Sequence, residues 1–315
     1  MSDSFFAAEG SLSGSCRLCP RRCGADRNRN TGFCVAGAEM EVARIMLHHW
    51  EEPPISGPDP TDEGLGSGTV FFSHCSLGCV YCQNRKISRS DAKGTAYSPE
   101  ELARELVRLE AEGAYNVNFV SPTHYADRIA ETVKIARRNG LTIPVVWNTG
   151  GYERPEAIDA LNGIADIFLT DFKYASPELA KKYSGAEDYP GTAASSLARM
   201  VSLAGPPVFS EDGMMKKGVI VRHLCLPGCR EDSVRVLRKI AETVPVKDVR
   251  LSLMAQYTPD FLPPADPASP DPWKKIRRKI TTYEYEVITE EASRLGFEGW
   301  MQERSSATAR FTPDF

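Results

Sequence analysis

The chain has 315 residues, with 38 Lys and Arg against 42 Asp and Glu, and a formal net charge of −4 at pH 7. This length suits one barrel-sized domain or two smaller ones, and the slightly acidic balance gives no basic field that would attract nucleic acid. We therefore expect no nucleic-acid partner. No apolar run is long enough to cross a bilayer, so we expect no membrane partner either. Nine cysteines without a secretion signal predict a reducing, cytoplasmic setting.

Residues 1–66 form a cysteine-rich segment. Cys16, Cys19, Cys23 and Cys34 follow one another as C-x2-C-x3-C-x10-C, in a stretch with too little apolar periodicity to fold around a core of its own. Four thiolates suit either a tetrahedral zinc ion or a closed iron–sulfur cluster, and the spacing does not separate the two. We therefore expect a second metal centre here, because bound metal commonly stabilises such segments; free thiols are the alternative.

From residue 69 onward, short apolar strands alternate with helices. A capping box at Ser98–Glu101 opens a helix that Gly113 closes, and a second helix runs from about 124 to 139. Such alternation predicts an α/β fold with a parallel sheet and right-handed crossovers, here an incomplete (β/α)6 barrel over residues 67–303 with a tail at 304–315. The six expected strands are 69–73, 116–121, 143–147, 166–170, 219–224 and 249–253.

Cys75, Cys79 and Cys82 follow the first strand as C-x3-C-x2-C. Three thiolates can hold three irons of a four-iron cluster, which leaves the fourth iron open, and an open metal position is typical of catalysis. A disulfide framework does not suit a long chain with an odd number of cysteines. A closed zinc site would need a fourth ligand, for which His74 is the neighbour in sequence.

The other expected strands also end in polar side chains. In parallel barrels the chemistry gathers at the carboxyl ends of strands, so these residues are expected to face the cysteine loop. They are Ser121 and Thr123 after the second strand, Asn148 and Thr149 after the third, Asp171 and Lys173 after the fourth, and Arg222 and His223 on the fifth. Asp171 with Lys173 or Arg222 could equally form a plain ion pair, and His223 could be a buried structural histidine.

With Tyr81 directly before its last cysteine, the triplet resembles that of the radical S-adenosylmethionine (SAM) superfamily. Residues 48–57, 122–125 and 171–174 resemble its pyruvate formate-lyase-activating-enzyme-like branch. The resemblance implies a [4Fe-4S] cluster on the triplet, bound SAM, and SAM contacts from Tyr81 and the strand-end residues. Many relatives carry Gly-Gly-Glu where this chain has 121–123, so the contact to the methionyl amino group would fall to Thr123 or to backbone carbonyls.

By this resemblance, the predicted function is reductive cleavage of SAM to a 5′-deoxyadenosyl radical that abstracts hydrogen from a glycine of a partner glycyl radical enzyme. Flavodoxin or ferredoxin would supply the electron. One alternative is a peptide or small-molecule substrate with the Pro-rich stretch 259–272 as a lid, and another is an iron–sulfur or zinc binding module without catalysis. The extra cysteines precede the triplet, unlike a ferredoxin-like insert, so no relay role is carried over to them. Cys225 and Cys229 are expected to be ordinary packed thiols.

Overall fold

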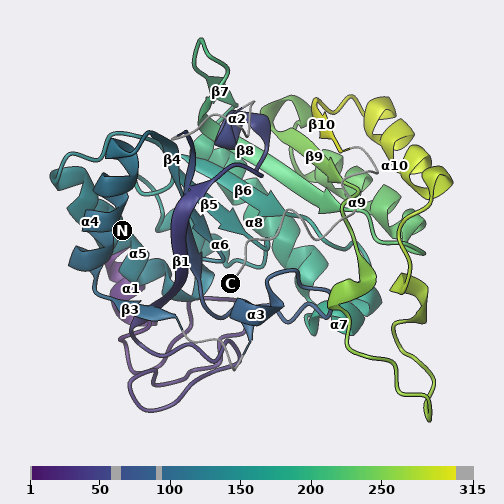
Figure 1. Ribbon diagram of the computed structural model, residues 1–315, viewed down its shortest axis with the longest axis horizontal. Coiled ribbons are helices and arrows are strands. Elements are labelled where there is room, and N and C mark those ends of the chain that lie inside the picture. The colour runs from purple at the N-terminus through teal and green to yellow at the C-terminus, as the bar shows by residue number, and fades with distance from the viewer. Residues whose placement is uncertain (1, 58–64, 90–93, 303–315) are drawn as a thin grey trace.

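The computed structural model of the chain describes residues 2–57, 65–89 and 94–302 (Figure 1). The predicted tail, 304–315, lies outside these residues. The described strands form one open sheet in the order β10-β9-β8-β6-β5-β4-β2-β1-β3, with β7 attached to β8. The predicted α/β fold with an incomplete parallel barrel is confirmed, since the sheet curves without closing.

All six predicted strands are present and lie side by side in chain order, each parallel to the next. All seven residues of the first of them are buried, as expected for a strand covered on both faces. The six are β2 (Gly66–Phe72), β4 (Ala114–Val120), β5 (Val145–Thr149), β6 (Ile167–Asp171), β8 (Met215–Leu224) and β9 (Arg250–Met254).

Four further strands extend the sheet beyond the prediction. β1 (Met40–His48) pairs antiparallel with β2, and β3 (Thr95–Tyr97) pairs with β1. At the other edge, β10 (Gly299–Met301) lies parallel to β9, and β7 (Val208–Phe209) is antiparallel to β8. β1 comes from the cysteine-rich segment, so part of that segment is continuous with the sheet.

Helices connect the strands and cover the outer face of the sheet (Figure 1). The capping box is confirmed, since Ser98 and Glu101 exchange hydrogen bonds of 2.9 and 3.2 Å. The longer helices are α4 (Pro99–Ala111), α5 (Ala126–Arg138), α7 (Pro177–Ser184), α8 (Tyr189–Ala204), α9 (Arg230–Thr243) and α10 (Thr282–Arg294), with α1 (Ser2–Glu9) near the N-terminus. The shorter ones are α2 (Pro53–Ser56), α3 (Arg85–Ser88), α6 (Pro155–Asp159) and four 3-10 turns, at Thr123–Tyr125, Val246–Asp248, Pro259–Phe261 and Lys274–Ile276.

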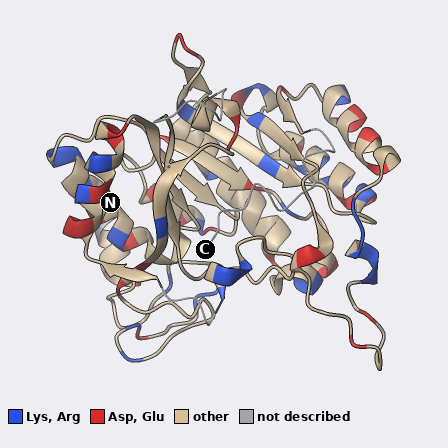
Figure 2. Ribbon diagram, viewed as in Figure 1, with Lys and Arg blue, Asp and Glu red and all other residues tan. Residues whose placement is uncertain are grey.

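The core lies between the sheet and these helices. Trp147, Phe119 and Phe168 are fully buried on neighbouring strands, and each such side chain contributes roughly 2–3 kcal/mol by leaving water. Figure 2 shows charged residues of both signs on the outer helices, while the central strands are largely uncharged. Within the described ranges, no helix is both long and apolar enough to span a membrane. Because the sheet is packed against this core, it holds the carboxyl ends of its strands in place around the cysteine loop.

Candidate active site

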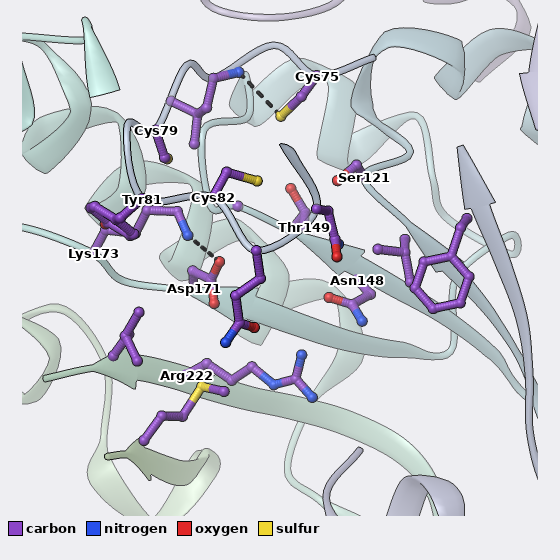
Figure 3. Close-up of a pocket in the computed structure, with 18 of the residues that line it drawn as sticks. Cys75, Cys79, Tyr81, Cys82, Ser121, Asn148, Thr149, Asp171, Lys173 and Arg222 are labelled. Carbon is purple, nitrogen blue, oxygen red and sulfur yellow. Dashed lines mark hydrogen bonds and ion pairs between the residues drawn. The ribbon is translucent and has the colours of Figure 1, made fainter. Parts of the chain in front are cut away.

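A cavity of about 230 Å³ lies at the carboxyl ends of the parallel strands. Its wall includes the loop after β2 and the ends of β4, β5, β6 and β8 (Figure 3). Ten of the predicted site residues line it: Cys75, Cys79, Tyr81, Cys82, Ser121, Asn148, Thr149, Asp171, Lys173 and Arg222. The sheet thus gathers side chains that are up to about 150 positions apart in the chain.

The three cysteines of the triplet present their thiols to this cavity. The Leu77 backbone N–H donates to Cys75 Sγ at 3.4 Å, and the Ser88 hydroxyl donates to Cys82 Sγ at 3.5 Å. Burial raises the pKa of Cys75 to about 12, and the neighbouring thiols add to this effect. Ionised thiols here need compensating positive charge, which a bound metal centre supplies.

His74, the neighbour considered as a zinc ligand, is directed away from the thiols. Its Nε2 lies 3.3 Å from Glu41 Oε2, on the neighbouring antiparallel strand β1. His74 is therefore not placed to serve as the fourth ligand of a metal at the triplet. Three thiols that face one cavity fit a cluster with one open iron.

Lys173 and Asp171 form an ion pair beside the triplet (Figure 3). Burial opposes the charge of Lys173, but Asp171 and Cys79 outweigh it and hold the pKa of Lys173 well above its usual value. The Tyr189 hydroxyl accepts a hydrogen bond from the Lys173 backbone N–H at 3.0 Å and lies 3.1 Å from the carbonyl oxygen of Asp171. This edge of the cavity therefore carries a fixed cation next to sulfur.

Arg222 forms a buried network with two glutamates. Its guanidinium donates to both carboxylate oxygens of Glu52, at 2.7 and 2.6 Å, and also to Glu51. Glu51 accepts further hydrogen bonds from Asn118 at 3.0 Å and from Asn148 at 3.3 Å. Burial would raise the pKa of Glu51, but Arg222 outweighs it and holds this pKa below its usual value. The network fixes Asn148 at the cavity floor.

Glu153 organises the hydroxyl groups behind the cavity. Its Oε1 accepts hydrogen bonds from Thr123 at 2.6 Å, Thr149 at 2.5 Å and the indole of Trp147 at 3.4 Å. Burial raises the pKa of Glu153 to about 7, although these hydrogen bonds act in the opposite direction. Thr123, Thr149 and Ser121 line a smaller neighbouring cavity together with Cys75.

Two predicted residues differ in their placement from the other ten. Thr123 faces the smaller cavity and not the main one. His223 lines neither of these two cavities: it is 2% exposed, and its Nδ1 lies 2.7 Å from the carbonyl oxygen of Phe172. His223 is therefore buried outside both cavities, and its Nε2 has no hydrogen-bond partner among the described residues. Cys225 and Cys229 are buried free thiols, as expected.

Several lining residues were not predicted as site residues from the sequence. They are His48, Trp50, Glu51, Phe71, Leu77, Gln83, Asn84, Val120, Gly150, Leu224, Met254 and Gln256. The acidic pair in the stretch 48–57 was a signal that could have found Glu51, and Gln83 and Asn84 directly follow the triplet. For Glu153, which binds two of the site hydroxyls, the sequence carried no such signal beyond its place after the third strand.

The four N-terminal cysteines are free thiols in the structure, as are the three of the triplet. Across the described ranges, no three His, Cys, Asp or Glu side chains are arranged so that they could hold a single metal ion. The finding applies both to the four N-terminal cysteines and to the triplet.

The comparisons with known proteins agree with the site. A sequence model of the Radical SAM superfamily matches residues 69–207, the part that contains the triplet and the strands β2 to β6. "Uncharacterized protein MJ0674" of Methanocaldococcus jannaschii is 28% identical over 294 residues, which cover 89% of this chain and 75% of that protein.

A solved structure shares the fold. A radical SAM methyltransferase from Sphaerobacter thermophilus superposes with a TM-score of 0.50 at 14% identity, over 75% of this chain and 66% of that one. Streptococcus suis SuiB bound to precursor peptide SuiA gives a TM-score of 0.48 at 12% identity, over 73% of this chain. This chain spans 47% of the length of SuiB.

The superfamily match and the site lead to the same cofactors. The matched residues carry the three cysteines, and the described cavity joins them to the polar strand ends that SAM would contact. Superfamily members are enzymes, which sets aside the alternative of a binding module without catalysis. Residues 69–207 thus match the radical SAM superfamily, and the chain is an enzyme that uses a [4Fe-4S] cluster and SAM.

Proposed function

We propose that this enzyme abstracts a hydrogen atom from a glycine of a partner protein. A [4Fe-4S] cluster on Cys75, Cys79 and Cys82, once reduced, supplies the electron that cleaves SAM to methionine and a 5′-deoxyadenosyl radical. Superfamily enzymes need a reductant, and the donor proposed here is a flavodoxin or ferredoxin. The role of the protein is to bind SAM in one orientation and to keep water and other hydrogen donors away.

The strand-end residues divide the binding of SAM among them. Lys173 is the proposed partner of the SAM carboxylate, because its charge acts directly on the thiols of Cys75 and Cys82. Asn148 and Thr149 are the proposed ribose contacts. Their orientation is fixed from behind, Asn148 by Glu51 and Thr149 by Glu153.

The contact to the methionyl amino group is proposed for Ser121 and Thr123. Both hydroxyls line the small cavity beside Cys75, and the Thr123 hydroxyl donates its proton to Glu153. Its oxygen lone pairs are therefore left to accept a hydrogen bond from an amino group. This arrangement would serve the function that Gly-Gly-Glu serves in many relatives.

The size of the cavity is the observation that favours a protein substrate. A cavity of about 230 Å³ is smaller than the roughly 300–1,000 Å³ that pockets for a single small molecule usually have. SAM would fill most of this space, so a second small molecule would find little room. A glycine in an extended backbone has no side chain that would need room in the cavity. Its path into the cavity would pass Trp50, which lines the cavity and is 44% exposed.

The alternative of a peptide or small-molecule substrate placed the Pro-rich stretch over the site as a lid, and no residue of that stretch lines the cavity. The cavity lining ends at Gln256, and residues 258–272 do not contribute to it. In Figure 1, the loop that contains residues 258–272, between β9 and α10, runs away from the carboxyl ends of the strands.

The test has two stages. Anaerobically reconstituted protein, reduced with dithionite, is expected to form 5′-deoxyadenosine from SAM, while Cys75→Ala is not; Cys229→Ala, which removes a cysteine outside both sets, should retain the activity. The protein is then incubated with a purified glycyl radical enzyme labelled with α-deuterated glycine. Deuterium in 5′-deoxyadenosine and a doublet signal in electron paramagnetic resonance (EPR) support the proposal. Active enzyme that transfers no deuterium from glycine contradicts it.

A further inference from the structure

The N-terminal cysteines lie in a long segment without regular structure. Residues 10–39, all of them described, contain no helix or strand, and an isolated bridge between Cys16 and Ala25 is their one element of sheet pairing. These are the purple loops at the bottom of Figure 1, below β3. Loops of this length are uncommon in compact domains unless they have a function or a bound group that orders them.

The loop folds its cysteines toward one another: Cys23 Sγ lies 4.0 Å from the Cys16 carbonyl oxygen, and a Cβ on Gly32, two residues before Cys34, would lie 2.3 Å from the same sulfur. Cys19 interacts electrostatically with Cys34, Cys16 and Cys23. The backbone N–H of Leu18 also bonds to the sulfur of Cys16, and that of Arg21 bonds to the sulfur of Cys19. In both cases the donor comes two residues after the cysteine.

The same local pattern occurs in the catalytic triplet. The N–H of Leu77 bonds to Cys75, and that of Asn84 bonds to Cys82, again two residues later. Hydrogen bonds to ligand sulfurs are one of the features by which a protein tunes a bound iron–sulfur cluster. The N-terminal loop is therefore built like the loop that holds the radical cluster.

Backbone strain marks the same positions. Among the described residues, the non-glycine residues with positive φ are Arg22 at 42°, Val35 at 66°, His74 at 74° and Ser121 at 58°. Arg22 precedes Cys23, Val35 follows Cys34, and His74 precedes Cys75. A β-branched valine in this region is a clear outlier, and such strain persists where a functional geometry requires it.

The N-terminal segment also contacts the triplet loop directly. Arg21 donates to the carbonyl oxygen of Ser76 at 3.2 Å and to that of Ser184 at 3.3 Å. Ser76 follows Cys75, and the Ser184 hydroxyl lies 3.0 Å from Cys79 Sγ. Arg21 therefore connects the backbone near Cys19 to the surroundings of two triplet cysteines.

A second contact involves Phe33, the neighbour of Cys34. Its ring lies under the guanidinium of Arg21, 3.8 Å from ring centroid to Cζ. A Cβ on Gly78 would be 3.3 Å from Phe33 Cζ, so Phe33 packs against the residue that precedes Cys79. Two packed residues, Phe33 and Gly78, thus bring Cys34 and Cys79 into proximity.

From these contacts we propose that Cys16, Cys19, Cys23 and Cys34 bind a second, closed [4Fe-4S] cluster that passes electrons to the triplet cluster. A one-electron protein donor reduces the second cluster from the 2+ to the 1+ state, and the same electron then reduces the triplet cluster while the second returns to 2+. The four thiolates complete the second cluster, so SAM does not bind there. The relay role rests on the proposed radical function, whereas the binding of the second cluster does not.

Metal content tests the second cluster. After anaerobic reconstitution, the wild-type chain and Cys229→Ala should each hold about eight irons, because each cluster contains four. A variant with Cys75, Cys79 and Cys82 all changed to Ala should hold about four, and so should one with the four N-terminal cysteines changed to Ala. In the first variant, the EPR signal of the reduced cluster should not change when SAM is added. A folded triplet variant that holds zinc, or no iron, overturns the proposal.

The relay is tested in the wild-type protein, so it does not depend on how the N-terminal variant folds. Oxidised protein is mixed with reduced flavodoxin and freeze-quenched, and the EPR signal that SAM does not affect should appear before the one that SAM alters. Simultaneous appearance, or the reverse order, overturns the relay. If both clusters are present but no 5′-deoxyadenosine forms, the proposed function fails and the second cluster stands.

Discussion

The hydroxyl of Ser184, the last residue of α7, lies 3.0 Å from the sulfur of Cys79. The same hydroxyl is 2.8 Å from that of Tyr174, which is 2.5 Å from the hydroxyl of Tyr81. A buried chain of hydroxyl groups therefore ends at a ligand of the proposed radical cluster. Hydrogen bonds to sulfur are among the features by which a protein sets the reduction potential of a cluster.

Ser184→Ala should make the reduction potential of the triplet cluster more negative. The variant removes a donor that stabilises the extra negative charge of the reduced state. An EPR-monitored redox titration would measure the shift. Ser195→Ala on α8 is the matched control, because that exposed hydroxyl bonds to the Gly191 carbonyl within its own helix and should leave the potential unchanged. An equal or higher potential in Ser184→Ala would mean that the hydroxyl does not donate to Cys79.

Glu153 should make the stability of the protein depend on pH. Burial raises its pKa from 4.5 to about 7, so between these values the folded chain holds a proton that the unfolded chain has lost. The contribution of Glu153 to stability is thus largest below pH 4.5 and falls as the pH rises to about 7, by roughly 3 kcal/mol for a shift of this size. Glu153→Gln cannot ionise and should lack this loss. Urea unfolding of both cluster-free proteins at pH 5 and pH 7.5 checks this: equal pH dependence in the two would refute the assignment.

The strands of the barrel could be predicted because they are short apolar runs bounded by turn residues, a pattern that depends on local sequence alone. β10 could not, since its three residues pair with β9 by tertiary placement, and Gly299 and Met301 are exposed. His223 was placed at the site although it follows Arg222 directly. Successive side chains of a strand point to opposite faces, so only one of these neighbours can reach the cavity. Asp171 and Lys173, two positions apart, both do.

The carboxylates that hold the site residues in place, Glu51 and Glu153, could not be predicted from the sequence. Glu51 lies 171 positions from Arg222, and no local pattern indicates that the two meet. Glu153 accepts hydrogen bonds from both Thr123 and Thr149 because β4 pairs with β5, which brings these two residues together. Sequence indicates which residues follow the strands, whereas the partners that orient them depend on strand order.

Arg222→Met should destabilise the protein by about 3–5 kcal/mol, because it leaves two buried carboxylates without their cation. Glu51 and Glu52 are 7% and 6% exposed in their side chains, so water cannot replace the guanidinium. Arg222→Lys keeps the charge but loses the fork that binds both, so its loss should be smaller. The effect of Arg222→Met should shrink as the pH falls and the carboxylates take up protons. Urea unfolding measures all three; a loss that is independent of pH would contradict the electrostatic cause.

Gly151→Ala should disturb the cation beside the triplet through the backbone. Gly151 has φ of 77°, and a Cβ there would lie 2.1 Å from the carbonyl oxygen of Asp171, so the end of β6 must move. Gly140→Ala is the matched control, since its φ is 103° but nothing lies within 4 Å of the added atom. Backbone strain alone should cost Gly140→Ala about 1 kcal/mol, and the clash should cost Gly151→Ala about 2 kcal/mol more. Because Asp171 holds Lys173, Gly151→Ala should also weaken SAM binding in calorimetry. Equal SAM affinity in the two variants would show that the ion pair does not position the cofactor.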